Sequence, residues 1–331
     1  MIISKTPYRI SFFGGGTDYK EWYSNYGSEI ISTSINKYIY LSLRKLPPFF
    51  KKKNRVIYSS IEEINSFNQI RLFPLKKILI YEKINNGIEF HYDGQMPAKS
   101  GVGSSSSFVV GLINLCSCIK NNNLSKYELA KKAISIERNV LKEVVGIQDQ
   151  IATSFGGFNY IKIDKKGNFK VKKIFENKKD EKKLNDNLVL LYTGIQKLKR
   201  EDLKKYVKNL TTKSHDYMRE ISEITKEAKK LLVNKDFERF GELLDISWQI
   251  KKKLSNRITN SSVDEIYNLA MKNGAKGGKI LGAGGGGFFL FYVPKEKRKR
   301  FLRKMNFLVN VNFEFENDGS KILLKDKDEK F

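Results

Sequence analysis

The sequence predicts an α+β fold built as two domains. The chain has 331 residues, 40% of them apolar, which is enough to bury more than one core. Strand patterns occupy both ends of the chain, and helical periodicity dominates much of its middle. A polar, lysine-rich stretch at residues 164–186 indicates a hairpin and a linker. We therefore expect domains at residues 1–180 and 181–331, with a single large domain as the alternative.

The first half is predicted to alternate strands, turns and helices. Residues 9–13 form a strand that ends in the glycine turn 14–18, and residues 38–43 alternate as a sheet strand does. Residues 46–90, which contain three prolines, are expected to mix strand and short helix. A helix should begin near Leu124 and end at Gly146. Its apolar stripe is Leu129, Ala133, Ile136, Val140 and Val144.

The second half is predicted to surround long helices with strands. A further helical piece at 148–153 and a strand at 159–163 come before the linker. The later elements are a buried strand at 187–192, amphipathic helices across 200–273, strands at 279–281 and 288–293 on either side of a glycine run, a basic helix at 295–305 and a final strand pair. Strands flanked by helices predict a second α+β unit.

Charge and cysteine content narrow the class of protein. The net charge is +26, but the lysines are spread along the whole chain, and solvent-exposed faces of helices and strands account for most of them. We therefore expect no nucleic-acid partner, while an anionic small substrate is compatible with the excess. Two cysteines, Cys116 and Cys118, and two histidines make a zinc site improbable, so any metal should bind oxygen ligands, as magnesium does.

Hydropathy predicts a soluble protein. The longest apolar run, near residues 108–119, is too short to cross a bilayer, and the chain opens without a charged and apolar leader. Two free thiols fit a reducing compartment. We expect a cytoplasmic protein without membrane association, and the sequence leaves open a homodimer.

The most informative segment runs from Pro97 to Ser107 and leads into an apolar helix. Gly101 and Gly103 permit backbone turns that bring successive N–H groups toward one anion. The serines that follow offer hydroxyl groups and an N-cap, and the helix adds partial positive charge at its N-terminus. This segment is predicted to bind a polyphosphate, although a serine-rich loop that merely caps a core helix has the same composition.

Two further glycine-rich loops occur at residues 14–16 and 282–287. No loop has the Lys-Ser/Thr ending of a Walker A motif or the dinucleotide-binding glycine pattern. Taken in order, the segments at 7–19, 97–107 and 282–287 resemble the three motifs of the GHMP small-molecule kinases. The resemblance implies an N-terminal domain like ribosomal protein S5 domain 2, a ferredoxin-like C-terminal domain, and an active site in the cleft between them.

The resemblance also implies an ATP site with Mg²⁺. Ser105 is the expected hydroxyl ligand of the metal, and Glu137, twelve positions before Asp149, is its expected carboxylate ligand. A solvated helix position is the alternative for Glu137. The expected ATP-binding residues are Pro97, Lys99, Gly101, Val102, Gly103, Ser104, Ser105, Ser106 and Ser107.

By the same resemblance, Asp149 is the catalytic base and Arg9 stabilises charge on the transferred phosphoryl group. An N-cap role for Asp149 and a surface position for Arg9 are the alternatives. The expected substrate-binding residues are Asp18, Thr17, Gly15, Gly16, Gly284 and Gly285, although Asp18 is also a common turn residue and the last two glycines also suit a hairpin.

One departure bears on the substrate. Galactokinase-like members carry Gly-Glu-His before Thr-Asp-Tyr, whereas this chain has three glycines, residues 14–16. Its form is most similar to members that phosphorylate the anomeric hydroxyl of heptose 7-phosphate, on the route to nucleotide-activated heptose and surface polysaccharide. A kinase of an unphosphorylated sugar such as fucose, and a non-catalytic sensor of ATP and sugar, are the alternatives.

Overall fold

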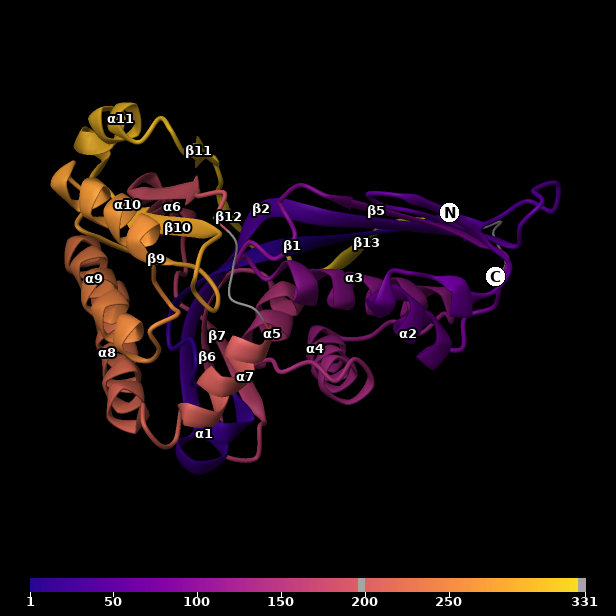
Figure 1. Ribbon diagram of the computed structural model, residues 1–331, viewed down its shortest axis with the longest axis horizontal. Helices are drawn as coiled ribbons and strands as arrows, with labels where there is room; N and C mark the ends of the chain where they lie inside the picture. The colour runs from indigo at the N-terminus through magenta and orange to yellow at the C-terminus, as the bar shows by residue number, and fades with distance from the viewer. Residues whose placement is uncertain (196–199, 327–331) are drawn as a thin grey trace.

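A computed structural model describes residues 1–195 and 200–326, which form two sheets with helices packed against them. The molecule is elongated, with the larger sheet at one end and the smaller sheet with its helices at the other (Figure 1). This arrangement confirms the predicted α+β class. None of the described helices is long and apolar enough to span a membrane.

The larger sheet has nine strands within the described ranges. They are β1 (Ile2–Phe13), β2 (Ser28–Lys45), β3 (Asn54–Ile57), β4 (Ile61–Ile64), β5 (Ile88–Gly94), β6 (Phe158–Ile163), β7 (Phe169–Lys173), β12 (Phe315–Glu316) and β13 (Lys321–Lys325). The main path is β13-β1-β2-β5-β3-β4, and β3 runs parallel to β5. β2 pairs with β6 along its first half and with β5 along its second half, so it organises the whole sheet.

Helices cover one face of this sheet (Figure 1). They are α2 (Phe73–Tyr81), α3 (Ser104–Ile119), α4 (Lys126–Ser135) and α5 (Gln148–Phe155), while α1 (Lys20–Tyr26) follows the first glycine turn. Twelve of the 16 residues of α3 are buried, which explains its continuous apolar sequence. Gly111 lets this helix approach the sheet, because a Cβ there would lie 2.7 Å from Thr6 Oγ1.

The smaller sheet is antiparallel, in the order β11-β8-β10-β9. Its strands are β8 (Leu188–Tyr192), β9 (Gly277–Ile280), β10 (Phe288–Tyr292) and β11 (Val309–Asn310). The associated helices are α6 (Lys178–Asp186), α7 (Arg200–Asn209), α8 (His215–Val233), α9 (Phe237–Lys253), α10 (Ser261–Lys272) and α11 (Lys295–Lys304). The ring of Phe240 on α9 packs 5.6 Å from that of Phe12 and 5.1 Å from that of Phe13, so the two units share an apolar contact at the end of β1.

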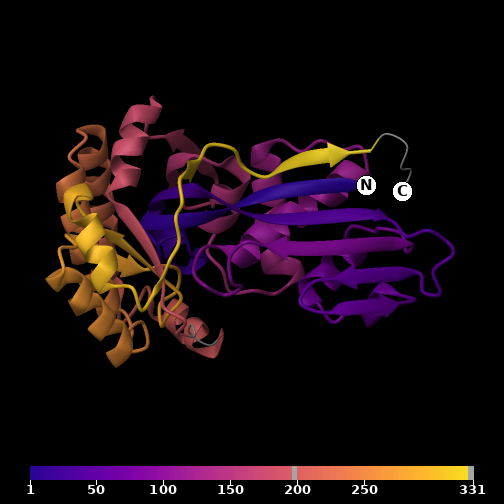
Figure 2. The ribbon, with the colours of Figure 1, turned by 90° about the horizontal axis from the view of Figure 1, so that it is seen from above.

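Two sequence expectations about individual elements are wrong. The helix expected to reach Gly146 stops being regular at Ser135 and continues as a π-helical turn, η2 (Ile136–Val140), although the expected start is confirmed by a capping box of Ser125 and Glu128. Of the strands that follow α11, β11 joins the smaller sheet, but the last two, β12 and β13, do not extend the second unit. They pair with the larger sheet, and Figure 2 shows β13 beside β1. The domain division at residue 180, which falls within α6, stays a prediction.

Candidate active site

The segment from Pro97 to Ser107 passes into α3 through two glycines with positive φ. Gly103 is the N-cap of α3 at φ +76°, and Gly101 has φ +102°. A Cβ on Gly101 would lie 2.5 Å from the Leu281 carbonyl oxygen, so only glycine fits there. Since no side chain among the described residues caps α3, its first N–H groups remain available to an anion.

The four serines after Gly103 differ in their surroundings. The Ser104 hydroxyl accepts a hydrogen bond from the Lys99 amide at 3.1 Å, and Ser107 donates to the Pro7 carbonyl at 2.9 Å. Ser105 is exposed, whereas Ser106 is buried beside the Glu137 carboxyl. Two serines therefore shape the loop, and the other two remain to meet a ligand.

Arg9 and Asp149 form a two-pronged ion pair beneath this loop. Arg9 Nε donates to Asp149 Oδ1 and Nη2 donates to Oδ2, each at 2.7 Å. Arg9 Nη1 also donates to the Gly101 carbonyl at 2.5 Å, which joins β1, the loop and α5. The Arg9 side chain is 5% exposed and that of Asp149 is 25% exposed, so only the carboxylate has open access to a reactant.

Glu137 is a buried carboxylate that forms no ion pair with any described residue. Its Oε2 accepts from the Gln150 amide at 2.6 Å, and Oε1 has no hydrogen-bond partner among the described residues. Burial raises the pKa of Glu137 to about 7, because hydrogen bonds from the Ser106 hydroxyl and the Gln150 amide only partly offset the loss of hydration. The solvated helix position considered for this residue is excluded, because Glu137 is 1% exposed.

Asp18, which the sequence analysis expects to bind substrate, is more deeply buried than a residue that contacts a sugar would need to be. Asp18 is 1% exposed, and its oxygens accept from the Gly16 amide and from the amide and side chain of Gln148. A Cβ at Gly146 would overlap Asp18, so the two residues pack against each other. Burial raises the pKa of Asp18, and the Asp149 charge adds to the rise. Asp18 thus holds the start of α5, and its contact with substrate stays a prediction.

The residues just before Asp18 also differ in how much of each is exposed. Thr17 is fully buried and donates to the Gly14 carbonyl at 2.8 Å, so it closes the turn. Gly15 is partly exposed above Ser11 and Gln148, and Gly16 adopts φ +102°. Gly14 and Gly16 are buried, so Gly15 is the one accessible residue among these three glycines and Thr17.

The third glycine loop, residues 282–287, lies directly against the second. The Phe288 amide donates to the Ser100 carbonyl at 3.1 Å, and a Cβ on Gly287 would lie 2.2 Å from the same oxygen. Gly285 donates to the Ile258 carbonyl at 2.8 Å, and Gly284 adopts φ +105° beside that residue. The structure therefore brings the second and third loops together.

Sequence reasoning missed two buried lysines at this junction. Lys279 on β9 donates to the Phe12 carbonyl at 2.6 Å, and Lys251 on α9 donates to the Gly282 carbonyl at 2.6 Å. Burial lowers the pKa of Lys279 to about 7, and the Arg9 charge adds to the fall. A lysine between a glycine pair and the apolar Ile280-Leu281, just before a glycine run, was the available signal.

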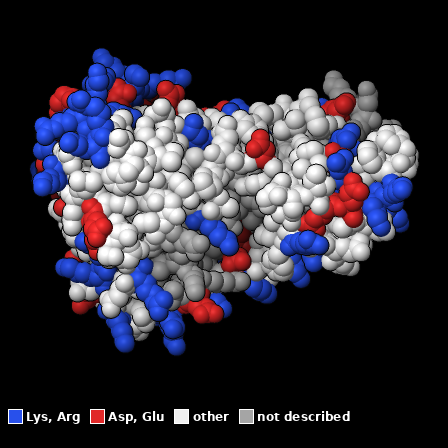
Figure 3. All heavy atoms as spheres, turned by 45° about the horizontal axis from the view of Figure 1, so that its top comes forward, with Lys and Arg blue, Asp and Glu red and all other residues white. Residues whose placement is uncertain are grey.

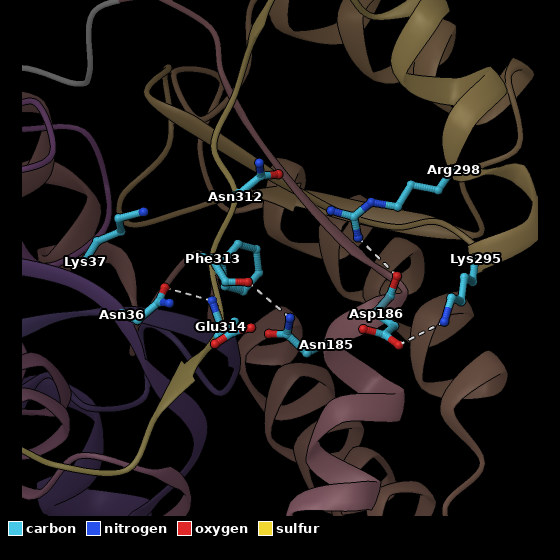
Figure 4. A pocket seen from close by; sticks show the side chains of 9 residues that line it. All are labelled: Asn36, Lys37, Asn185, Asp186, Lys295, Arg298, Asn312, Phe313 and Glu314. Carbon is cyan, nitrogen blue, oxygen red and sulfur yellow. Dashed lines mark hydrogen bonds and ion pairs between the residues drawn. The ribbon is translucent and has the colours of Figure 1, made fainter.

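A separate hollow of about 570 Å³ lies away from these residues. Figure 4 shows its lining of Asn36, Lys37, Asn185, Asp186, Lys295, Arg298, Asn312, Phe313 and Glu314. Its polar groups bond to one another: Lys295 pairs with Asp186 at 3.2 Å, and Asn185 donates to the Phe313 carbonyl at 3.1 Å. The first of these contacts ties α11 to α6, and the second ties the chain before β12 to α6. No predicted site residue takes part in either.

The charged surface shows no single basic stripe on the face drawn in Figure 3. Lys and Arg crowd the end that carries α11, but acidic side chains lie among them and wide uncharged areas separate the groups. On this face the positive charge is therefore spread over separate groups of side chains.

Two family models and several known proteins are similar to this chain. Residues 73–157 match the GHMP kinases N terminal domain, and residues 228–310 match the GHMP kinases C terminal domain. The D-glycero-alpha-D-manno-heptose 7-phosphate kinase of Campylobacter jejuni is 32% identical over 97% of this chain and 98% of its own. A mevalonate kinase of Methanocaldococcus jannaschii is 27% identical over 92% of this chain and 96% of its own.

A solved structure shares the complete fold. The D-glycero-D-manno-heptose 1-phosphate kinase of Bacteroides thetaiotaomicron covers 99% of this chain and 100% of its own, with a TM-score of 0.80 at 23% identity. Fold, loops and full-length relatives together define a phosphotransferase that uses an alcohol group as acceptor. The chain belongs to the GHMP kinase family, whose kinases use ATP.

Proposed function

We propose that the protein transfers the γ-phosphoryl group of ATP to the anomeric hydroxyl of D-glycero-D-manno-heptose 7-phosphate, giving the 1,7-bisphosphate. The observation that carries the reaction is the Arg9–Asp149 pair beneath the loop that opens α3. Support for the substrate comes from the full-length relative named for heptose 7-phosphate. We expect the enzyme to act in the cytoplasm, where ATP and sugar phosphates occur.

In this proposal Asp149 accepts the proton of the attacking hydroxyl. Each of its oxygens already accepts one hydrogen bond from Arg9, but a carboxylate has further lone pairs, and 25% of this side chain is exposed. Arg9 fixes the orientation of the carboxylate. The N–H groups at the start of α3 would bind phosphate oxygens, because the loop backbone turns toward that point.

Glu137 and the serine loop fit a magnesium ion. The unpartnered Glu137 Oε1 and a serine hydroxyl are hard oxygen donors, and burial makes the carboxylate costly until a cation arrives. No group of three or more His, Cys, Asp or Glu side chains suited to a metal occurs in the described part of the chain, so phosphate oxygens would supply further ligands. When bound, Mg²⁺ neutralises charge on the phosphates. Ser106 suits this role better than Ser105, because it already lies at Glu137.

The experiment is phosphorus NMR of the protein with MgATP and a panel of acceptors. The panel contains heptose 7-phosphate, heptose 1-phosphate, hexose 6-phosphates, fucose, galactose and mevalonate, and Asp149→Asn is the control. We expect a new anomeric phosphate signal with heptose 7-phosphate alone. Turnover only with a free sugar or mevalonate would reject the proposed substrate, and no turnover with any acceptor would favour the sensor alternative.

A further inference from the structure

Lys279 connects the two sheets at the point where the glycine loops meet. It lies on β9 of the smaller sheet, and its ammonium group donates to the carbonyl of Phe12 on β1 of the larger sheet. Phe12 stands three residues after Arg9 and two before Gly14. One side chain of the second unit therefore holds the strand that carries both Arg9 and the first glycine loop.

The surroundings of Lys279 do not balance its charge. Lys279 is 5% exposed, and no described carboxylate forms an ion pair with it. Two of its three N–H groups have no acceptor among the described residues, since its one recorded hydrogen bond goes to Phe12. Burying an ammonium group with a single neutral acceptor is costly, so a purely structural reading leaves this residue unexplained.

The charged side chains near Lys279 already have other hydrogen-bond or ion-pair partners. Arg9 on β1 faces it, but the Arg9 fork is taken by Asp149 on α5 and by Gly101. On α9, which packs against β9, Asp245 accepts from Tyr267 and from Gln249, and Lys251 donates to the third glycine loop. Arg9, Lys251 and Lys279 thus bring three basic side chains to this junction, and Asp149 is already paired with Arg9.

We propose that Lys279 is a positioning residue of the phosphoryl-transfer site, whose charged form clamps β1 to the third glycine loop and is completed by the anionic ligand. This inference rests on the proposed function. Binding of a polyphosphate supplies the missing negative charge and keeps the Lys279 ammonium group protonated. Ligand binding near pH 8 should therefore be coupled to proton uptake at this residue, because burial lowers its pKa to about 7 in the free protein.

The first test measures that proton. ADP with Mg²⁺ is titrated into the protein by calorimetry at pH 8 in two buffers of different ionisation enthalpy. We expect wild type to take up more protons than Lys279→Met, and Lys276→Met, an ion-paired lysine near the surface three residues earlier, to match wild type. Any release from Glu137 is common to all three proteins and cancels in the comparison. Equal uptake by wild type and Lys279→Met would overturn the proposal.

The second test separates positioning from simple stability. In Lys279→Met we expect kcat to fall roughly 10- to 100-fold, the cost of a charged hydrogen bond, with the KM for ATP changed less than about threefold. Lys279→Arg, a permanent cation, should keep more kcat than Lys279→Met and show no ligand-linked uptake at this position. If Lys279→Met does not fold, Lys279→Arg alone tests the proposal. Proton uptake by Lys279→Arg equal to that of wild type would refute the role of Lys279. Failure of every sugar as acceptor would instead reject the proposed function and leave the ADP result intact.

Discussion

A buried carboxylate lies near each end of α3, and the two carboxylates differ in whether a described lysine pairs with them. Beyond the C-terminal end, the side chain of Glu82 is 3% exposed and pairs with Lys120 at 2.7 Å and Lys132 at 2.8 Å. Burial alone would raise the pKa of Glu82, but the two lysines outweigh it and lower that pKa. At the N-terminal end, Glu137 is also buried, and it has no ion pair within the part of the chain that the structure describes. Glu82, which is paired within the protein, supports the fold, whereas Glu137 is the carboxylate that we propose to hold Mg²⁺.

We expect the largest loss of activity from a substitution at Asp149, near the N-terminal end of α3. Replacing Asp149 with Asn removes the proton acceptor and keeps the shape, so we expect kcat to fall on the order of a thousandfold. Binding of MgATP, measured by calorimetry, should remain within about threefold, since the amide still accepts from Arg9. Near-normal turnover would remove Asp149 from the role of base.

Glu137→Gln tests whether the unneutralised carboxylate awaits magnesium. We expect kcat to fall about tenfold or more and the Mg²⁺ concentration for half-maximal rate to rise, because a neutral amide is a poorer ligand for a hard cation. Rates measured across a Mg²⁺ titration check this. A Glu137→Gln variant with wild-type Mg²⁺ dependence would contradict the assignment.

The stability of the same variant should move in the opposite direction from its activity. The folded pKa of Glu137, about 7, lies above the ordinary 4.5, so the buried carboxylate destabilises the protein above pH 7, and this penalty is relieved as the pH falls toward 4.5. Without Mg²⁺, Glu137→Gln should therefore be more stable than wild type at pH 8, by up to about 3 kcal/mol, and the gain should shrink toward pH 5. Denaturant unfolding at both pH values provides the measurement.

Glu82→Gln supplies the matched control at the other end of α3. The folded pKa of Glu82 is lowered, so its contribution to stability is present above about pH 4.5 and is lost as the pH falls through the folded pKa. We expect a loss of about 2 kcal/mol at pH 7, moderated because both lysines are partly exposed, with kcat within about twofold of wild type. A large loss of activity with little loss of stability would break the comparison between the two ends.

The smallest effect sharpens the choice between adjacent serines. Ser106→Ala should lower kcat about tenfold, since this hydroxyl lies at Glu137, whereas Ser105→Ala should change kcat less than about threefold. Steady-state rates at saturating ATP distinguish them. The reverse order would return the metal to Ser105, the residue that the sequence motif indicated.

The local sequence determined a large part of this protein. Glycine at 101 and 103 permits the positive φ values of the loop before α3, Ser125 and Glu128 set the start of α4, and the apolar residues of α3 require burial on all sides. Such features depend on neighbours within a few residues, so they can be predicted without the fold. The order of the three glycine loops and the presence of Asp149 and Glu137 were sufficient to indicate a kinase.

Tertiary structure alone decided which side chains meet. Lys279 and Phe12 are 267 positions apart, and their contact arises only when the two sheets pack. Arg9 and Asp149 are 140 positions apart, and their contact arises only when α5 packs on the larger sheet. The π-helical turn η2 interrupts a sequence whose apolar spacing favours a regular helix, and the pairing of β13 with β1 returns the end of the chain to the first sheet. The physical reason is the same in each case: side-chain burial and charge balance depend on residues distant in sequence, and no local pattern encodes them.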